Sequence, residues 1–278
     1  MATSWEKHDS VQRAVSYTHL PKMTAKASIS RVGPAGGGLQ APSLDRLEEH
    51  GIVGAGGGGF PTAVKLKTTV SMVIANAAEC EPLLHKDKEL LHHHAEPFLR
   101  GMKMAMDLVG AREGVVGIKE KYHEIIAALE AQVPAGVRVQ PLPDCYPAGD
   151  EFILVHMVTG RVIPPGGLPK DVDTVVSNVE TLMNIALDKP VTHKYLTVAG
   201  AVETPVTLRV PIGITIGEVI EAAGGTTVED FGVLIGGVMT VSYTHLSMTH
   251  NPVRSLRASL CIESTLSTWR MFISFRIL

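Results

Sequence analysis

A glycine-rich segment, GAGGGGFPT, could carry chemistry in this 278-residue sequence. It occupies residues 54–62 and is followed by Lys65. Because glycine has no Cβ atom, successive backbone N–H groups can approach an anion closely, and a helix that begins just after the loop would add its dipole. The segment therefore predicts a phosphate-binding loop, although it lacks the GK[ST] ending of a nucleotide P-loop. A flexible linker is the alternative, but a linker has no need of Phe60 or of a cation at Lys65.

Three further segments place polar side chains at the ends of expected strands. NAAECEP begins at Asn76 and puts Glu79 and Glu81 just after a hydrophobic run. YPAGDE, from residue 146, and SNVET, from residue 177, add further acids, amides and hydroxyls. Ligands of open α/β sheets bind at the carboxyl ends of the strands, where carboxylates suit ribose hydroxyls or a polar heterocycle. Each segment alone is equally typical of a solvated loop or a helix cap, but together they predict one polar ligand site.

The elements that must position these segments alternate between strand and helix. Hydrophobic periodicity predicts strands at residues 71–76, 114–118, 137–139 and 175–178, and helices at 43–50, 98–109, 122–131, 151–158 and 180–187. This alternation predicts an α/β fold with a Rossmann-like layer domain over residues 41–190. Short strands at 195–198, 206–210 and 231–235 around one helix at 216–223 predict a small β-grasp domain over residues 191–240.

The hexapeptide VSYTHL occurs twice, at residues 15–20 and 241–246, without similarity around either copy. A structural repeat would be longer and less exact. We therefore expect residues 1–40 to be foreign or disordered and residues 241–278 to be a foreign tail. Ordinary coding sequence is the alternative interpretation of both copies.

Composition excludes several classes of protein. A net charge of −3, with 45% hydrophobic and 19% charged residues, argues against disorder and against a basic nucleic-acid-binding protein. The three cysteines form no CxxC pair, which predicts a reduced, cytoplasmic protein without a disulfide framework. No apolar run reaches the ~18 residues of a membrane span, so we expect no direct membrane insertion. The histidines at 92–94 and the methionines at 102 and 106 predict a solvated face and core filling, not a metal site.

The four motifs GAGGGGFPTAVK, NAAECEP, YPAGDE and SNVET, in this order, resemble the flavin-carrying subunit of bacterial complex I and its relatives. The stretch GRVIPPGGLP at residues 160–169 favours the branch that contains the C subunit of the Rnf ferredoxin:NAD oxidoreductase and the cobalamin reductase of propanediol-utilisation microcompartments. Residues 191–240 resemble the soluble-ligand-binding β-grasp (SLBB) domain of the same family.

This resemblance implies an NADH-dependent oxidoreductase, in which FMN accepts hydride from NADH for onward one-electron transfer to other electron-transfer subunits or an iron–sulfur domain. It also implies a location in the cytoplasm, either peripheral to a membrane complex at the inner membrane face or in a microcompartment. No catalytic side chain is required, because the flavin accepts the hydride. The FMN and NADH contacts implied by the family motifs are Gly54, Gly56, Gly57, Gly59, Phe60, Lys65, Asn76, Glu79, Glu81, Tyr146, Gly149, Asp150, Glu151, Asn178 and Thr181.

The sequence departs from the complex I pattern at two positions. Ala55 stands where that pattern has arginine, and Ala78 where it has aspartate. In addition, full-length relatives carry 4Fe-4S clusters beyond the β-grasp domain, and this chain has no cysteine motif for them. These departures leave open a second hypothesis, a non-catalytic ligand- or subunit-docking module with a vestigial flavin site.

Overall fold

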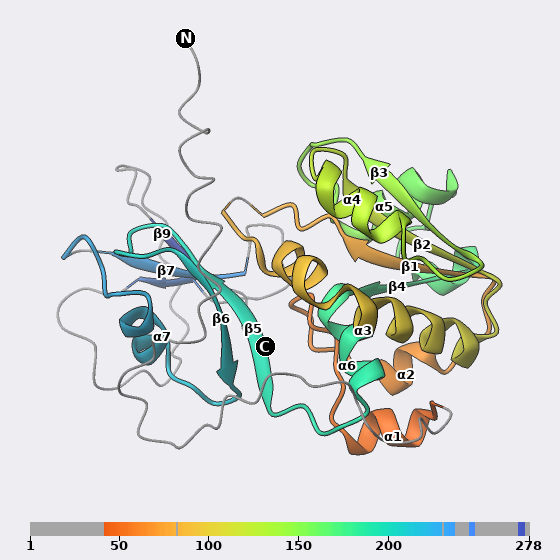
Figure 1. Cartoon of the computed structure of the whole chain (residues 1–278), viewed down its shortest axis with the longest axis horizontal. Helices are drawn as coiled ribbons and strands as arrows, with labels where there is room; N and C mark the ends of the chain where they lie inside the picture. Colours follow the sequence, from red (N-terminus) through yellow and green to blue (C-terminus); the bar gives the residue numbers. More distant parts are fainter. Residues whose placement is uncertain (1–41, 82, 230, 237–244, 248–271, 276–278) are drawn as a thin grey trace, which may run out of the picture. The chain divides into compact units, whose positions relative to one another are not determined.

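The computed structural model describes residues 42–81, 83–229, 231–236, 245–247 and 272–275 (Figure 1). The chain divides into two compact units, one over residues 38–192 and one that begins at His193. Residues 1–40, expected to be foreign or disordered, lie outside the described residues, as does most of the segment 241–278.

The first unit is built on a parallel sheet of four strands in the order β3-β2-β1-β4. The strands are β1 (Met72–Ala77), β2 (Glu113–Lys119), β3 (Val137–Leu142) and β4 (Thr174–Asn178). Because β1 lies between β2 and β4, the strand order reverses beside β1, which makes the carboxyl ends of β1 and β4 the switch point of the sheet. Asn76 and Asn178 are register partners at this point.

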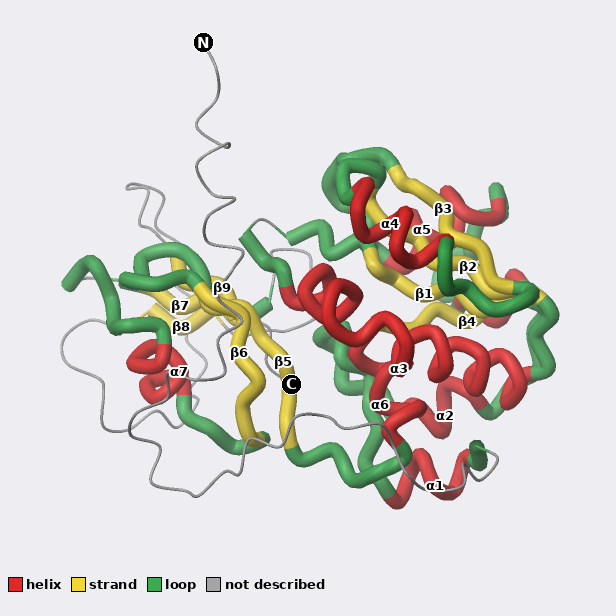
Figure 2. Tube along the Cα trace, viewed as in Figure 1, coloured by secondary structure: helices red, strands yellow, loops and turns green. Residues whose placement is uncertain are grey.

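Helices cover this sheet (Figure 2). Those that contact its strands are α3 (Lys86–Val109), α4 (His123–Glu130), α5 (Glu151–Thr159), the 3₁₀ helix Pro169–Val172 and α6 (Val179–Leu187). Helix α1 (Leu44–Glu49) packs against α2 (Thr62–Leu66), which contacts α3. Met72 and Ile74 of β1 pack with Leu154 and Val155 of α5 in one core cluster. Successive side chains of a strand point to opposite faces, so the intervening residues of β1 face the other side, where α3 and α6 pack against the strand. Such a strand, buried on both faces, is typical of a parallel sheet.

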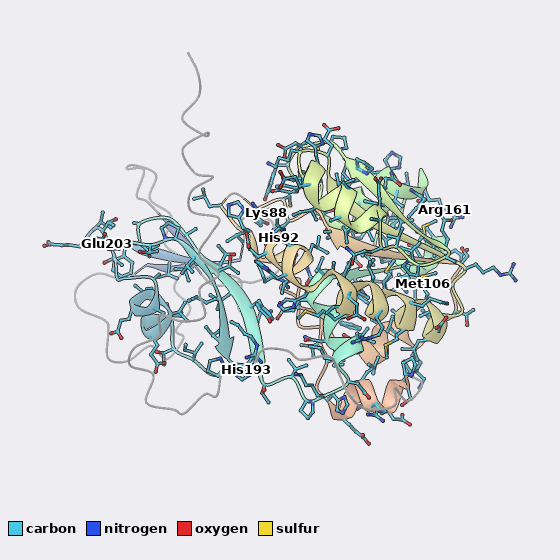
Figure 3. The ribbon with its side chains drawn as sticks, viewed as in Figure 1. Lys88, His92, Met106, Arg161, His193 and Glu203 are labelled. Atoms are coloured by element: carbon cyan, nitrogen blue, oxygen red, sulfur yellow. The ribbon has the colours of Figure 1, made fainter. Side chains whose placement is uncertain are left out.

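Helix α3 is longer than the expected helix at 98–109, because it begins at Lys86. Pro97 lies inside it and His94 has non-helical backbone angles, so the helix is kinked where the proline removes a backbone donor. His92 is exposed and Met106 is buried, as their spacing predicts (Figure 3). At Gly101, α3 meets α6 so closely that an added Cβ atom would lie 1.7 Å from the carbonyl oxygen of Leu182.

The second unit contains three short β elements and one helix that the sequence predicts, together with two further strands. Strands β5 (His193–Val198) and β6 (Val206–Pro211) are antiparallel, and their Thr197 and Thr207 hydroxyls lie 2.9 Å apart. Helix α7 (Ile216–Ala222) begins with a capping box formed by Thr215 and Glu218. Strand β7 (Gly232–Ile235) pairs with β8 (His245–Ser247) and β9 (Phe272–Phe275), which lie in the segment expected to be a foreign tail. None of the helices in the described part of the chain has the length and hydropathy needed to span a membrane.

Candidate cofactor-binding site

A cavity of about 310 Å³ lies at the switch point of the parallel sheet. All four predicted motifs contribute to its wall, although they come from distant parts of the sequence. The predicted site residues in the wall are Gly54, Gly56, Phe60, Lys65, Asn76, Glu79, Glu81, Gly149, Asp150, Glu151, Asn178 and Thr181.

Three predicted residues, Gly57, Gly59 and Tyr146, are not part of this wall. The two glycines instead shape the loop, since both have positive φ angles, and Tyr146 precedes the wall residue Pro147. Sequence reasoning missed other residues that the structure places in the wall, namely Gly58, Thr62, Cys80, Asp87, Pro147, Phe152, Val176 and Ser177. Most of these lie within or beside the four motifs, so their position could have been inferred, but Asp87 lies in a stretch for which the sequence predicts no element and no site.

The glycine-rich loop is a closed turn, not a flexible linker. The N–H of Gly54 donates to the carbonyl of Phe60 at 2.8 Å, and the N–H of Gly59 donates to the carbonyl of Gly54 at 3.2 Å. The N–H of Ala55 donates to the Thr181 hydroxyl at 2.8 Å, which ties the loop to α6. The loop is therefore held in place by its own backbone and by the helix that follows β4.

Lys65 supplies a cation to the cavity wall. Its Nζ donates to the carbonyl oxygen of Val176 at 2.9 Å and to Glu151 Oε1 at 3.2 Å, and its side chain is 32% exposed. The neighbouring Asp150 caps α5, because its carboxylate accepts hydrogen bonds from the N–H groups of the next turn. Of these two acids, Asp150 thus has a structural role in the helix, and Glu151 orients the lysine.

Two asparagines join the segments that surround the cavity. Asn76 donates through Nδ2 to the Gly149 carbonyl at 2.7 Å and accepts from the Ala78 N–H at 3.2 Å. Asn178 caps α6, where its Oδ1 accepts from the N–H of Glu180 at 3.0 Å. The amides therefore fix the shape of the loops after β1, β3 and β4.

A buried ionic cluster lies behind the cavity wall. Lys86 is 1% exposed, and its Nζ donates to Asp87 Oδ1 at 2.5 Å and to Glu180 Oε2 at 3.0 Å. Burial alone would lower the pKa of Lys86, but the carboxylates of Asp87, Glu180 and Glu79 outweigh it and raise the pKa above its ordinary value. The ammonium group is therefore charged throughout the physiological range. Sequence reasoning did not find this cluster.

Two hydroxyls in the wall are buried without a protein partner in the described part of the chain. Thr62 and Ser177 are 1% and 4% exposed, and neither Thr62 Oγ1 nor Ser177 Oγ has a hydrogen-bond partner among the described residues. Buried polar atoms of native proteins are nearly always hydrogen-bonded to protein, water or ligand. The cavity therefore offers hydrogen-bonding groups that a polar ligand would satisfy.

Aromatic side chains complete the wall. Phe60 is 50% exposed and Phe152 is 47% exposed, although both are large apolar residues. Exposed apolar rings beside convergent polar groups are typical of sites for small molecules with flat ring systems.

The parallel sheet, the closed glycine loop and the polar cavity at the switch point together define a protein that binds a nucleotide-type cofactor. Residues 47–187 match the family model of the Nuo51 FMN-binding domain, and residues 195–241 match the SLBB domain. The chain belongs to the Nuo51 FMN-binding family, which confirms the resemblance to the flavin-carrying subunit of complex I.

Two of the relatives belong to the branch that the sequence motifs favour. The chain is 50% identical over 199 residues to the cobalamin reductase PduS of Citrobacter freundii, and this match covers 70% of the chain and 44% of the relative. It is 38% identical over 200 residues to the C subunit of the Na⁺-translocating ferredoxin:NAD⁺ oxidoreductase complex of Acetobacterium woodii, covering 68% of this chain and 45% of the relative. The chain thus spans about half the length of these relatives.

The fold is also similar to that of a solved structure. An NAD⁺-reducing [NiFe]-hydrogenase in its air-oxidized state matches with a TM-score of 0.61 and 27% identity, over 74% of this chain and 42% of the hydrogenase chain. This similarity confirms the expected α/β fold with a parallel sheet.

The thiol of Cys80 can report on the cavity. Cys80 is half-buried in the wall, whereas Cys145 is exposed and outside it. We expect iodoacetamide to label both residues in the protein alone, and about tenfold less labelling of Cys80 once a ligand fills the cavity, because alkylation requires an accessible thiolate. Peptide mass spectrometry with and without FMN measures both sites in one sample. Equal labelling of Cys80 in the two samples would place FMN elsewhere.

Proposed function

We propose that this chain is an electron-transfer flavoprotein module that binds FMN and accepts hydride from NADH for onward one-electron transfer. The observation that carries the proposal is the pair of buried hydroxyls, Thr62 and Ser177, without partners among the described residues in the wall of a cavity at the switch point. FMN carries hydroxyl, carbonyl and imide groups that would satisfy such atoms. Membership of the Nuo51 FMN-binding family supports this assignment.

The residues in the wall fit FMN chemically. Lys65 would hold the phosphate together with backbone N–H groups of the glycine loop, because a cation and convergent amides both stabilise a phosphate. Phe60 presents an exposed ring against which a flat heterocycle can stack. Glu79 and Glu81, each 7% exposed, supply acceptors for the hydroxyl groups of FMN or NADH. When bound, FMN supplies the hydride-accepting atom, so the protein needs only to bind, orient and exclude water.

The two departures from the complex I pattern do not open holes in the site. Ala55 is 3% exposed and Ala78 is fully buried, and Ala78 packs in the core cluster under α5. Small apolar side chains therefore close the positions where the complex I pattern has a cation and an anion. The cation at Lys65 remains in the wall, which argues against a vestigial flavin site and so against the docking module as the main function.

The relatives support a proposal about partners and location. Named relatives are a cobalamin reductase and a subunit of an ion-translocating ferredoxin:NAD⁺ oxidoreductase complex. We infer that electrons leave this module toward other electron-transfer subunits or an iron–sulfur domain of the 4Fe-4S type. We also infer a cytoplasmic location, peripheral to a membrane complex or in a microcompartment, and no nucleic-acid partner, in keeping with the net charge of −3.

The test is a titration of the full chain with FMN, followed by NADH under anaerobic conditions. We expect FMN fluorescence to be quenched with a micromolar or lower dissociation constant, and the absorbance of bound flavin near its visible maximum to bleach on NADH addition. FAD, whose adenylate blocks the phosphate end of the flavin, serves as the control ligand and should bind more weakly. Absence of FMN binding would overturn the proposal and favour the docking module, whereas binding without bleaching would contradict the NADH step.

A further inference from the structure

We propose that Lys86 is a positioning residue of the cofactor site, whose charge holds two walls of the cavity together from behind. The proposal rests on the proposed function, since it assigns Lys86 a role in FMN binding without direct contact. Lys86 is not in the cavity wall, but its neighbours Asp87 and Asn178 and the nearby Glu79 are.

The contacts of Lys86 join separate elements. Lys86 and Asp87 begin α3, Asn178 ends β4, and Glu180 lies in the first turn of α6. The Lys86 ammonium donates to the carboxylates of Asp87 and Glu180 and lies 3.4 Å from Asn178 Oδ1. The start of α3 is thereby fixed to the end of β4.

Asp87 connects Lys86 to two residues of the cavity wall. Its Oδ2 accepts from Asn178 Nδ2 at 2.7 Å, which sets the orientation of that amide at the switch point. Its backbone N–H donates to Glu79 Oε2 at 2.8 Å, and Glu79 has a φ of 27°, in the left-handed region that a non-glycine residue rarely adopts. The loop that carries Glu79 is therefore held in an unfavourable conformation by the residue next to Lys86.

Burial of the charged Lys86 side chain costs free energy, and its carboxylate partners offset this cost. A lysine at the first position of a helix faces the positive end of the helix dipole, and burial of its ammonium adds a desolvation penalty. The carboxylates of Asp87 and Glu180 compensate for both effects. Without the lysine, these buried carboxylates would repel one another and the nearby Glu79, and the start of α3 would separate from β4.

The test compares three variants of the full chain. Lys86→Met removes the charge, Lys86→Met with Glu180→Gln removes one charge of each sign, and Lys103→Met removes an exposed lysine of the same helix that pairs only with Asp107 among the described residues. We expect FMN to bind at least about tenfold more weakly to Lys86→Met, and within about threefold of the unmodified chain to the paired variant and to Lys103→Met. The rescue distinguishes charge balance from simple loss of packing.

A second measurement does not depend on FMN. Hydrogen–deuterium exchange of the cofactor-free protein reports directly on the N–H of Asp87. We expect peptides over residues 79–88 to exchange faster in Lys86→Met than in the unmodified chain and to regain protection in the paired variant, while peptides of α5 stay unchanged. If Lys86→Met does not fold, Lys86→Gln, which keeps a hydrogen-bond donor but not the charge, replaces it in both measurements, and we expect the same loss of FMN affinity and of loop protection.

The outcomes separate this inference from the proposed function. If the unmodified chain does not bind FMN, the proposed function fails, whereas the exchange data still test the role of Lys86 in the loop. If the unmodified chain binds FMN and Lys86→Met binds it equally well, the positioning role is wrong. A folded paired variant that fails to regain FMN affinity or loop protection would also overturn the inference.

Discussion

Replacement of Gly101 by alanine is expected to destabilise the parallel-sheet unit by about 3 kcal/mol or more, enough to prevent folding of a marginally stable chain. In α3, the new Cβ atom would lie 1.7 Å from the carbonyl oxygen and 2.6 Å from the carbonyl carbon of Leu182 in α6. These are backbone atoms, so no side-chain rotation relieves the contact, and the two helices must move apart. Helix propensity alone would predict the opposite sign, a gain of ~1 kcal/mol for alanine over glycine.

Urea unfolding followed by circular dichroism measures this effect. Gly58→Ala is the matched control, because its added Cβ atom meets no atom of the described residues within 4 Å beyond its own chain neighbours, and we expect it to change the free energy of unfolding by less than ~0.5 kcal/mol. A Gly101→Ala chain as stable as the unmodified one would mean that α3 and α6 do not pack as described.

Replacement of Lys65 by methionine is expected to weaken FMN binding by about 10- to 100-fold. A hydrogen bond to a charged group contributes about 1.5–3 kcal/mol, and Lys65 is the lysine in the described cavity wall. Lys67→Met is the matched control, since Lys67 is exposed, follows in the same segment and is not in the wall. Fluorescence titration of both variants with FMN gives the two dissociation constants.

A second variant separates a direct role of Lys65 from an indirect one. Removal of Lys65 leaves Glu151 without its ion pair, and the unbalanced carboxylate could itself repel a phosphate. Lys65→Met combined with Glu151→Gln removes this repulsion. We expect the double variant to bind FMN as weakly as the single one, in contrast to the rescue at Lys86. Recovery of affinity in the double variant would contradict a phosphate contact at Lys65.

The sequence predicted the alternating elements because buried parallel strands and amphipathic helices have strong hydrophobic patterns. Strand β1 and helix α6 lie within a residue or two of their predicted ranges. The start of α3 was not predicted, because the polar stretch around the histidines and Pro97 lacks a clear helical period. Residues Thr62–Leu66 were expected only as a helix start, and their short helix α2 has no pattern of its own.

Much of the site could also be predicted, for a different reason. Its glycines, carboxylates and amides are grouped in four short motifs, and the rule for strand ends places such motifs at one edge of the sheet. The role of Lys86 could not be inferred, because a lysine beside an aspartate at a helix start is normally exposed. Only the three-dimensional contact with Glu180 shows that this lysine is buried.

The register pair of Asn76 and Asn178 has a consequence for how the protein is made. The cavity has no complete wall until β4 has paired with β1, and β4 is the last strand of its sheet to be synthesised. A ligand that binds there recognises only the fully assembled sheet, so it shifts the folding equilibrium by mass action, by about 2.7 kcal/mol at a concentration 100 times its dissociation constant. Because FMN is a phosphate of riboflavin, the riboflavin supply of the producing cell would then limit the yield of folded chain as well as its content of bound flavin.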